Sequence, residues 1–420
     1  MGPALILAGA GVAAFHLAYV VGGMGASLVV LFVFGVAGAA RLTSARGAFW
    51  LGLGMGFFVY GVQLFFFTRI FGVLAISLWL ILSVWVGFFV LSAHWARRRF
   101  GEWTMLAALP ILWMGFEYFR SELYVLKFAW VTPGLAFGPD QALRVLGVYG
   151  VGCLCMALAA GAWAPRGWWW RGAGVVVGVT VMAALTRLPA PGPTVALDPP
   201  PGPMIVGIQM ESAEPWKAVG WLEDARKAVP TADMFVLSEY TFAGLPPEDV
   251  RAWCRKNGKY LVAGGVADAA SGRNQFYDTA FVVGPSGDIV LQQVKSVPIQ
   301  FMADGLRAPQ QQLWASPWGP IGVCICYDLS YSRVTDRLVE MGAKLLIVPA
   351  MDARSWGAYE HGLHARIGPM RAAEYGVPIV RVCSSGISQM INGEGWVTSS
   401  AGYPGQGERV VGKVEMISAG

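Results

Sequence analysis

The chain has 420 residues, of which 55% are hydrophobic and only 14% are Asp, Glu, Lys or Arg. Soluble globular domains carry about 25% charged residues. The low charge and the mean hydropathy of +0.51 therefore exclude an ordinary soluble protein and favour a chain that lies partly in lipid. The net charge of +5 is modest, so its distribution matters more than its sum. The six cysteines show no spacing typical of a small disulfide-stabilised domain.

Long apolar runs recur as far as Leu188 and predict a membrane domain over residues 1–187. A helix needs roughly 17–25 residues to cross the bilayer core, and most of the runs supply them. The seventh run is short and glycine-rich, and if it failed to span, the second half would lie in the cytoplasm. We expect about seven spans, at Ala4–Val21, Met24–Ala40, Ala48–Phe67, Gly72–Leu91, Trp103–Phe119, Val145–Trp163 and Gly172–Leu188.

Basic residues concentrate in alternate loops between these runs. Loops rich in Lys and Arg stay on the cytoplasmic side of a membrane. The pattern predicts a cytoplasmic N-terminus and places everything after the seventh span on the far side. The tryptophans 168–170 beside Arg171 are typical of an interfacial belt and not of a nucleic-acid surface. The basic residues of the predicted inner loops are Arg41, Arg46, Arg97, Arg98, Arg99, Arg166 and Arg171.

Two features of the membrane half stand out. Glu117 and Arg120 end the fifth run, where they either anchor the helix at the interface or serve a function. The following segment, 127–141, is apolar and aromatic but is broken by Pro133 and Gly134. Because it is too short to span, we expect a re-entrant or interfacial segment, with a simple aromatic belt as the alternative.

A proline-rich linker, residues 188–203, precedes a region with a different hydrophobic pattern. Beyond it, short apolar runs typical of strands alternate with polar helical patterns, which predicts an α/β domain over residues 204–416. Among the expected strands are "MIVGIQM", "DMFVLSEYTF", "YLVAGGVAD", "IGVCICYD" ending at Cys326, "AKLLIVPAMD" and "PIVRVCSSG".

Three polar residues stand at the ends of expected strands: Glu239, Lys295 and Cys326. A thiolate is a strong nucleophile, but a free thiol is mostly protonated at neutral pH. A nearby carboxylate can take its proton, and a lysine can lower the thiol pKa and stabilise the oxyanion formed on attack at a carbonyl. Together they describe acyl transfer through a thioester, although such a trio is common in α/β domains when judged by spacing alone.

Other cysteines and histidines have simpler explanations. Cys324, two residues before Cys326, is expected to pack in the core. His361 and His364 form a His-x-x-His pattern, but no closed four-ligand spacing accompanies it, so we expect helix residues and no metal. Arg371 and Glu374 have the spacing of an ordinary helical ion pair.

The motifs around the three candidates resemble the nitrilase, or carbon–nitrogen hydrolase, superfamily. They are "VLSEYTF" at Glu239, "LQQVKSVP" at Lys295 and "GVCICYDLSY" at Cys326. The resemblance implies an αββα four-layer sandwich joined to the multi-pass α-helical membrane domain. It also implies that Glu239 is the general base, Lys295 stabilises charge and Cys326 is the nucleophile.

The membrane half narrows the resemblance to the bacterial apolipoprotein N-acyltransferases, through "ALPILWMGFEYFRSEL" and "FAWVTPGLAFGPDQALRVLGVYGVGCL". The family moves a fatty acyl chain from a phospholipid, through a cysteine thioester, to the α-amino group of a lipoprotein's N-terminal S-diacylglyceryl cysteine. It implies no cofactor, no nucleic acid, membrane lipid as surroundings, and an inner-membrane enzyme whose catalytic domain faces the periplasm. We expect a monomer. The substrate-binding candidates are Trp130, Trp216, Tyr327 and Asp328.

The sequence departs from the family pattern in three places. The family's second glutamate is missing from "KSVPIQFMADG", where Gln300 or Phe301 stands nearby and Asp304 is a candidate substitute. The segment from Lys295 to Cys326 is short, and no final span follows the second domain. These differences leave two alternatives open: a membrane-tethered amidase or hydrolase, and a catalytically silent lipid- or lipoprotein-binding homologue.

Overall fold

The computed structural model describes residues 2–164, 167–187, 202–211, 215–269, 275–308, 310–403, 405 and 407–417. The chain divides into two compact units, Met1–Pro191 and Gly192–Gly420, each with its own interior. The expected linker, 188–203, lies outside the described residues except for its last two positions.

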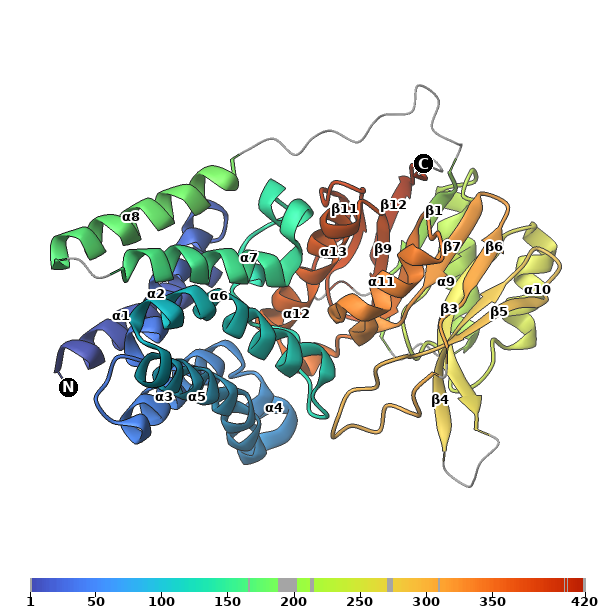
Figure 1. Ribbon diagram of the computed structural model, residues 1–420. Helices are drawn as coiled ribbons and strands as arrows, with labels where there is room; N and C mark the ends of the chain where they lie inside the picture. The colour runs from blue at the N-terminus through green and yellow to red at the C-terminus, as the bar shows by residue number, and fades with distance from the viewer. Residues whose placement is uncertain are drawn as a thin grey trace. The chain divides into compact units, whose positions relative to one another are not determined.

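The first unit is entirely helical in its described regular elements, and its helices run from blue to green in Figure 1. A helix covers most of each of the seven apolar runs. The elements are α1 (Gly2–Val21), η1 (Gly23–Leu28), α2 (Val29–Ala39), α3 (Ala45–Gln63), α4 (Phe67–Phe71), η2 (Gly72–Leu74), α5 (Ala75–Phe100), α6 (Glu102–Tyr118), η3 (Phe119–Leu123), η4 (Gly134–Ala136), α7 (Gln141–Ala162) and α8 (Trp168–Leu185).

Four stretches of the described chain are long and apolar enough, by length and composition, to cross a membrane. Gly23–Ala39 is a shorter apolar helix. Many large apolar side chains on these helices are exposed, including Ile6, Phe58 and Trp169, as expected for surfaces that face lipid. The four stretches are Gly2–Val21, Phe67–Phe100, Ala142–Ala162 and Trp168–Leu185.

The segment 127–141 packs inside the first unit. Its backbone is mostly non-helical, and residues 129–137 are buried. Tyr19 donates a hydrogen bond of 2.7 Å to the Thr132 carbonyl, which satisfies one of its backbone acceptors. Irregular backbone at membrane depth needs such protein partners, because lipid offers none.

Glu117 and Arg120 are also inside the first unit. Both side chains are buried and line a small cavity together with aromatic residues, among them Tyr60, Trp85 and Phe89. Arg120 donates a hydrogen bond of 2.9 Å to the Phe128 carbonyl. Because both side chains are buried and Arg120 bonds to an internal carbonyl, a role within the bundle is favoured over anchoring at the interface.

The second unit contains two mixed sheets of six strands each, drawn from yellow-green to red in Figure 1. One has the order β12-β1-β2-β3-β4-β5 and the other β11-β10-β9-β8-β7-β6. Parallel pairs at each centre join β1, β2 and β3 in the first sheet, and β7, β8 and β9 in the second. The strands are β1 (Met204–Ile208), β2 (Met234–Val236), β3 (Tyr260–Asp268), β4 (Phe276–Val283), β5 (Ile289–Val294), β6 (Leu313–Ser316), β7 (Gly319–Val323), β8 (Leu346–Ala350), β9 (Ile379–Cys383), β10 (Ser388–Ile391), β11 (Val397–Ala401) and β12 (Arg409–Lys413).

Apolar side chains from both sheets form a common core, to which Val236, Val262, Ile347 and Val380 contribute. The other face of the first sheet is covered by α9 (Pro215–Ala228) and α10 (Glu248–Asn257), with Leu222 and Trp253 in the packing. The second sheet contacts α13 (Ile367–Tyr375), which is accompanied by α11 (Ser332–Glu340), α12 (Ala358–Ala365), η5 (Cys326–Ser330) and η6 (Arg354–Trp356). The unit is the four-layer αββα sandwich expected from the resemblance.

The strand before Cys326 is shorter than expected. β7 ends at Val323, and Cys326 begins the 3-10 helix η5. The chain turns here because Cys326 adopts a φ of +49°, a left-handed conformation in which a strand cannot continue. The apolar run "IGVCIC" indicates burial, which is correct, but burial alone cannot locate the bend.

Candidate active site

Glu239 lies just beyond the end of β2, against the backbone of β3. A methyl group on Gly264 would overlap the Glu239 Cα, so only glycine allows this close approach. The next residue, Tyr240, adopts a φ of +51°. Its hydroxyl donates a hydrogen bond of 2.9 Å to Asp304. Tight packing against β3 therefore fixes the backbone of Glu239 just beyond the end of β2.

Lys295 directly follows β5, and its side chain is completely buried among carboxylates. Its Nζ lies 2.7 Å from Glu239 Oε1, 2.7 Å from Asp304 Oδ2 and 3.2 Å from Asp278 Oδ2. Two of the expected site residues, Glu239 and Lys295, are thus in direct contact. Asp278 and Asp304 complete a buried cluster around the ammonium.

The cluster fixes the charge of the lysine. Burial alone would lower the pKa of Lys295, but Glu239, Asp278 and Asp304 together raise it well above its ordinary value. Burial, reinforced by the charge of Glu239, raises the pKa of Asp278 well above the usual range. We infer that Lys295 is an ammonium in the resting cluster. The side chains of Glu239, Asp278 and Asp304 also form a possible cation site, but the Lys295 ammonium already supplies its positive charge.

Cys326 is buried, and its thiol lies 3.6 Å from the Met351 carbonyl oxygen. Burial raises the pKa of this thiol well above its ordinary value; the Glu239 charge adds to the effect and the Lys295 charge opposes it. Lys295 thus lowers the pKa of the Cys326 thiol as expected, but burial and Glu239 raise that pKa by more than Lys295 lowers it. In the resting site the sulfur carries its proton, so a base is needed before the sulfur can attack.

Asp328 ties the turn at Cys326 to the segment that carries Lys295. Its carboxylate accepts hydrogen bonds from the backbone N–H groups of Ser296, Val297 and Ile325, at 2.7–3.1 Å. Burial raises the pKa of Asp328 to about 6, although these backbone bonds oppose the shift. The left-handed conformation of Cys326 costs energy, and such strain persists only where surrounding structure enforces it. The Asp328 carboxylate provides that enforcement.

Arg371 supports the same turn from α13. Its guanidinium is buried and donates hydrogen bonds to the carbonyls of Leu329 (3.1 Å) and Ser330 (2.8 Å), while also pairing with Glu374. The helical ion pair inferred from spacing is therefore present, but it belongs to the interior of the domain. Its arginine holds the end of η5.

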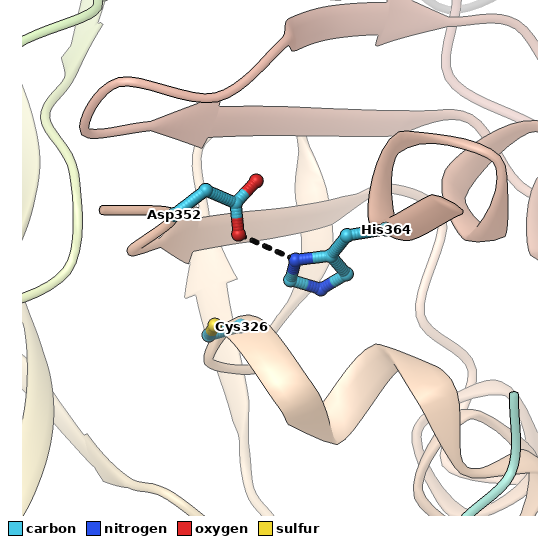
Figure 2. A group of neighbouring side chains, drawn as sticks. All are labelled: Cys326, Asp352 and His364. Atoms are coloured by element: carbon cyan, nitrogen blue, oxygen red, sulfur yellow. Dashed lines mark hydrogen bonds and ion pairs between the residues drawn. The ribbon is translucent and has the colours of Figure 1, made fainter. Parts of the chain in front are cut away.

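A second polar cluster includes Cys326 itself. The Cys326 sulfur, a carboxylate oxygen of Asp352 and a ring nitrogen of His364 all lie within 4.8 Å of one another (Figure 2). His364 and Asp352 are joined by a hydrogen bond of 2.6 Å. Asp352 Oδ2 also pairs with Arg381 Nη2 at 2.7 Å, so both carboxylate oxygens already have partners that a metal would have to displace.

The four residues expected to bind substrate have different surroundings. Trp130 is buried in the first unit, where its ring lies 5.6 Å from that of Phe128. The side chain of Trp216 lies outside the described part of the structure. Tyr327 is buried and packs edge-on against Tyr331, with ring centroids 5.0 Å apart. Asp328 is engaged by the backbone as described.

Sequence reasoning missed several residues of the site. Asp352 follows β8 and offers the same signal as Glu239, a polar residue after a buried strand. Asp278 lies within β4, where strand alternation hides its role. His364 has the pattern of an ordinary helix residue, and nothing in its local sequence indicates that it approaches Cys326.

Two family models match the chain. The carbon–nitrogen hydrolase model matches residues 219–410, and the model of the apolipoprotein N-acyltransferase N-terminal domain matches residues 7–161. The first match contains all three candidate residues of the triad. The second contains most of the helices of the first unit.

Curated relatives include apolipoprotein N-acyltransferases. The one from Geobacter metallireducens is 25% identical, with 84% of this chain and 78% of the relative aligned. The one from Nitrosomonas europaea is 27% identical, with 82% and 77% aligned. An omega-amidase from Xenopus laevis, NIT2-B, is 29% identical over 102 residues, 22% of this chain and 36% of its own length. The chain thus spans about a third of that amidase and most of each acyltransferase.

Solved structures of nitrilase-type proteins also resemble the chain. A carbon–nitrogen hydrolase from Helicobacter pylori aligns over 50% of this chain and 88% of its own, with 16% identity and a TM-score of 0.44. From the two family models and the acyltransferase relatives, which align along both units, we conclude that this chain belongs to the apolipoprotein N-acyltransferase family of the nitrilase superfamily.

Proposed function

We propose that this bacterial membrane protein is an acyltransferase that moves a fatty acyl chain from a phospholipid to a lipoprotein. The acyl group passes through a thioester on Cys326 and ends on the α-amino group of an N-terminal S-diacylglyceryl cysteine. The observation that carries the proposal is the buried Glu239–Lys295 pair beside a buried thiol, in a chain that also has the family's membrane domain.

The first half of the reaction follows from the charges in the site. As the Cys326 sulfur attacks the ester carbonyl, Glu239 accepts the thiol proton. The Lys295 ammonium and the backbone N–H of Tyr327 stabilise the oxyanion. Collapse breaks the carbon–oxygen bond, and Glu239 returns the proton to the departing alcohol of the lysophospholipid. The lysine stays charged throughout because its carboxylate neighbours raise its pKa.

Asp304 is the proposed substitute for the family's second glutamate. Its carboxylate lies 2.7 Å from Lys295 Nζ, whereas the Phe301 side chain is largely exposed. Asp328 and Arg371 are proposed to hold the turn at Cys326. Direct contact with substrate is the proposed role of Trp130, Trp216 and Tyr327.

The proposed location is the inner membrane, with several spans in residues 1–187 and the catalytic domain, 204–416, on the periplasmic side. Both substrates are lipids, so a catalytic domain held at the bilayer meets them there. Reporter fusions at Arg98 and at Asp288 test the orientation. At Arg98, a reporter that works only in the cytoplasm should be active. At Asp288, a reporter that works only in the periplasm should be active. The reverse result would contradict the proposed topology.

A transfer assay tests the activity. The purified full-length protein is incubated with phosphatidylethanolamine vesicles whose acyl chains are labelled, together with a diacylglyceryl-cysteine peptide. We expect label on the peptide nitrogen with wild type and with Cys324→Ala, and none with Cys326→Ala. Release of labelled fatty acid without transfer would favour the hydrolase alternative, and binding without either product would favour the silent homologue.

A further inference from the structure

His364 and Asp352 form a polar pair that the thioester chemistry of Glu239 and Lys295 does not use. A ring nitrogen of His364, a carboxylate oxygen of Asp352 and the Cys326 sulfur lie within 4.8 Å of one another. Figure 2 shows the imidazole and the carboxylate converging on one side of the sulfur. A group so close to the nucleophile is within reach of the acyl carbon bound to it.

The pair is rigidly supported. His364 Nδ1 lies 2.6 Å from Asp352 Oδ1. Because the pKa of Asp352 is lowered, its carboxylate is ionised and can only accept this hydrogen bond, so we assign the proton to Nδ1 and the basic lone pair to Nε2. Asp352 Oδ2 is held by Arg381 at 2.7 Å, and the backbone N–H of Asp352 donates to Ser384 Oγ at 3.0 Å. All of these side chains are buried. An imidazole held by a carboxylate beside a nucleophile has the general architecture of an acid–base group.

The two half-reactions differ in their proton balance. When the thiol attacks an ester, its proton leaves on the departing alcohol, so no proton is released and one carboxylate suffices. An α-amino group has a pKa of about 7.7–8.0 and reaches the site mostly as an ammonium. When it attacks the thioester, a carbon–nitrogen bond forms, the carbon–sulfur bond breaks, and two protons leave nitrogen. One returns to the Cys326 sulfur, and the other needs a second acceptor.

We propose that His364, oriented by Asp352, is the base that accepts this second proton from the incoming amine. The inference rests on the proposed function, because it concerns the acceptor half of the same reaction. It assigns Glu239 to the proton that shuttles to and from the Cys326 sulfur, and His364 to the other proton that the amine loses. The residue that touches the acceptor amine is then His364.

The surroundings suit a neutral base. Burial lowers the pKa of His364, although Asp352 opposes the shift. The other charged or titratable groups near it are Arg381 and His361, which lower its pKa further, and the Cys326 thiol. Burial alone would raise the pKa of Asp352, but His364 and Arg381 hold it well below its usual range. The imidazole is therefore unprotonated and the carboxylate ionised at neutral pH.

Measuring the two half-reactions separately tests the proposal. Full-length His364→Asn keeps an N–H donor near Asp352 but cannot take a proton. The first half-reaction is measured by incubating the protein with phospholipid alone and quenching samples over time. The second half-reaction is measured by adding a diacylglyceryl-cysteine peptide to the acyl-enzyme. We expect acylation within about threefold of wild type and aminolysis slower by about 10²–10⁴-fold, the usual contribution of a general base.

Controls separate chemistry from folding. His361→Gln changes the neighbouring buried histidine, which bonds to the Ala353 carbonyl at 2.9 Å. Because His361 only adjusts the pKa of His364, this variant should leave acylation near wild type and should slow aminolysis far less than His364→Asn does. Hydroxylamine, which is uncharged at neutral pH, should cleave the His364→Asn thioester at the wild-type rate, because it brings no surplus proton. His364→Gln is measured in parallel, so that the result does not depend on the folding of one variant.

The outcomes are distinguishable. If wild type forms no thioester, the proposed function itself is wrong and this inference falls with it. If wild type forms the thioester and both His364 variants react with the peptide at the wild-type rate, only the role of His364 is overturned. Equal slowing of acylation, aminolysis and hydroxylaminolysis would show a structural role and would also overturn it.

Discussion

The Nζ of Lys295 lies 2.7 Å from Asp304 Oδ2, the same distance that separates it from Glu239. Asp304 comes from the loop after β5, and it also accepts a hydrogen bond of 2.6 Å from the backbone N–H of Ile299. One carboxylate thus positions both the lysine and the loop that follows it.

Replacing Asp304 should therefore impair the first half-reaction. Asp304→Asn removes one of the charges that raise the pKa of Lys295 and loosens the loop. We expect acylation of Cys326 to slow by about 10–100-fold, or about 1.4–2.7 kcal/mol in activation free energy. Rapid-quench acylation measures this. Asp268→Asn, an exposed acid at the end of β3, is the control, and an equal loss in both variants would refute the assignment.

Asp328→Asn should separate the nucleophile from the lysine segment. The amide keeps a single acceptor oxygen, and its NH₂ group would face backbone donors that now bond to the carboxylate. Leaving buried donors unsatisfied costs about 1–3 kcal/mol each. We expect a lower unfolding temperature together with at least a roughly tenfold slower acylation. Normal acylation in a destabilised protein would contradict the positioning role.

Gly264→Ala tests the close approach of β3 to Glu239. The new methyl group would overlap the Glu239 Cα, so the backbone that carries the base must move. Such overpacking costs about 1–3 kcal/mol of stability, and we expect acylation to fall as well. Gly220→Ala in α9 is the matched control, because its added methyl group would meet no other atom within 4 Å. Unchanged acylation and stability in Gly264→Ala would show that the close approach does not hold the base in place.

The pH dependence of stability should report on Asp352. The folded state holds the pKa of Asp352 below its unfolded value of about 3.9. Its stabilising contribution is therefore fully present above about pH 3.9 and is lost as the pH falls through the lower folded value. Asp352→Asn leaves the Arg381 charge buried without its partner, at a cost of about 3–5 kcal/mol near pH 7.

Urea unfolding of the full-length protein in detergent, followed by tryptophan fluorescence, measures this difference. The gap between wild type and Asp352→Asn should be constant from about pH 8 to about pH 5 and should narrow below the unfolded carboxyl pKa of about 3.9. A gap that stays unchanged to strongly acid pH, or that widens there, would show that the Asp352 charge does not stabilise the fold.

Much of the fold is predictable because its signals are local. Tyr260–Asp268 matches the expected "YLVAGGVAD" strand, since apolar β-branched runs bounded by turn residues indicate strands. The bend at Cys326 is not predictable in this way, because the left-handed backbone there depends on Asp328 reaching Ser296 and Val297 across the domain. That contact joins segments that are distant in the chain and leaves no periodic trace.

Some residues of the candidate site are likewise predictable from the sequence, and others are not. Glu239, Lys295 and Cys326 each come soon after the end of a strand, and α/β domains usually assemble their sites at such ends. Asp278 is hidden within a strand. His364 is hidden in a helix whose buried face also carries His361, so only the folded chain shows which of the two histidines approaches the sulfur.

Mass spectrometry of the intact protein after incubation with phospholipid vesicles tests the central claim most directly. The account predicts a mass increase of one acyl chain, localised to Cys326 by peptide mapping, present in Cys324→Ala and absent in Cys326→Ala. An acyl chain that persists in Cys326→Ala, or lipoprotein acylation by a wild-type protein that never carries an acyl group on Cys326, would contradict it.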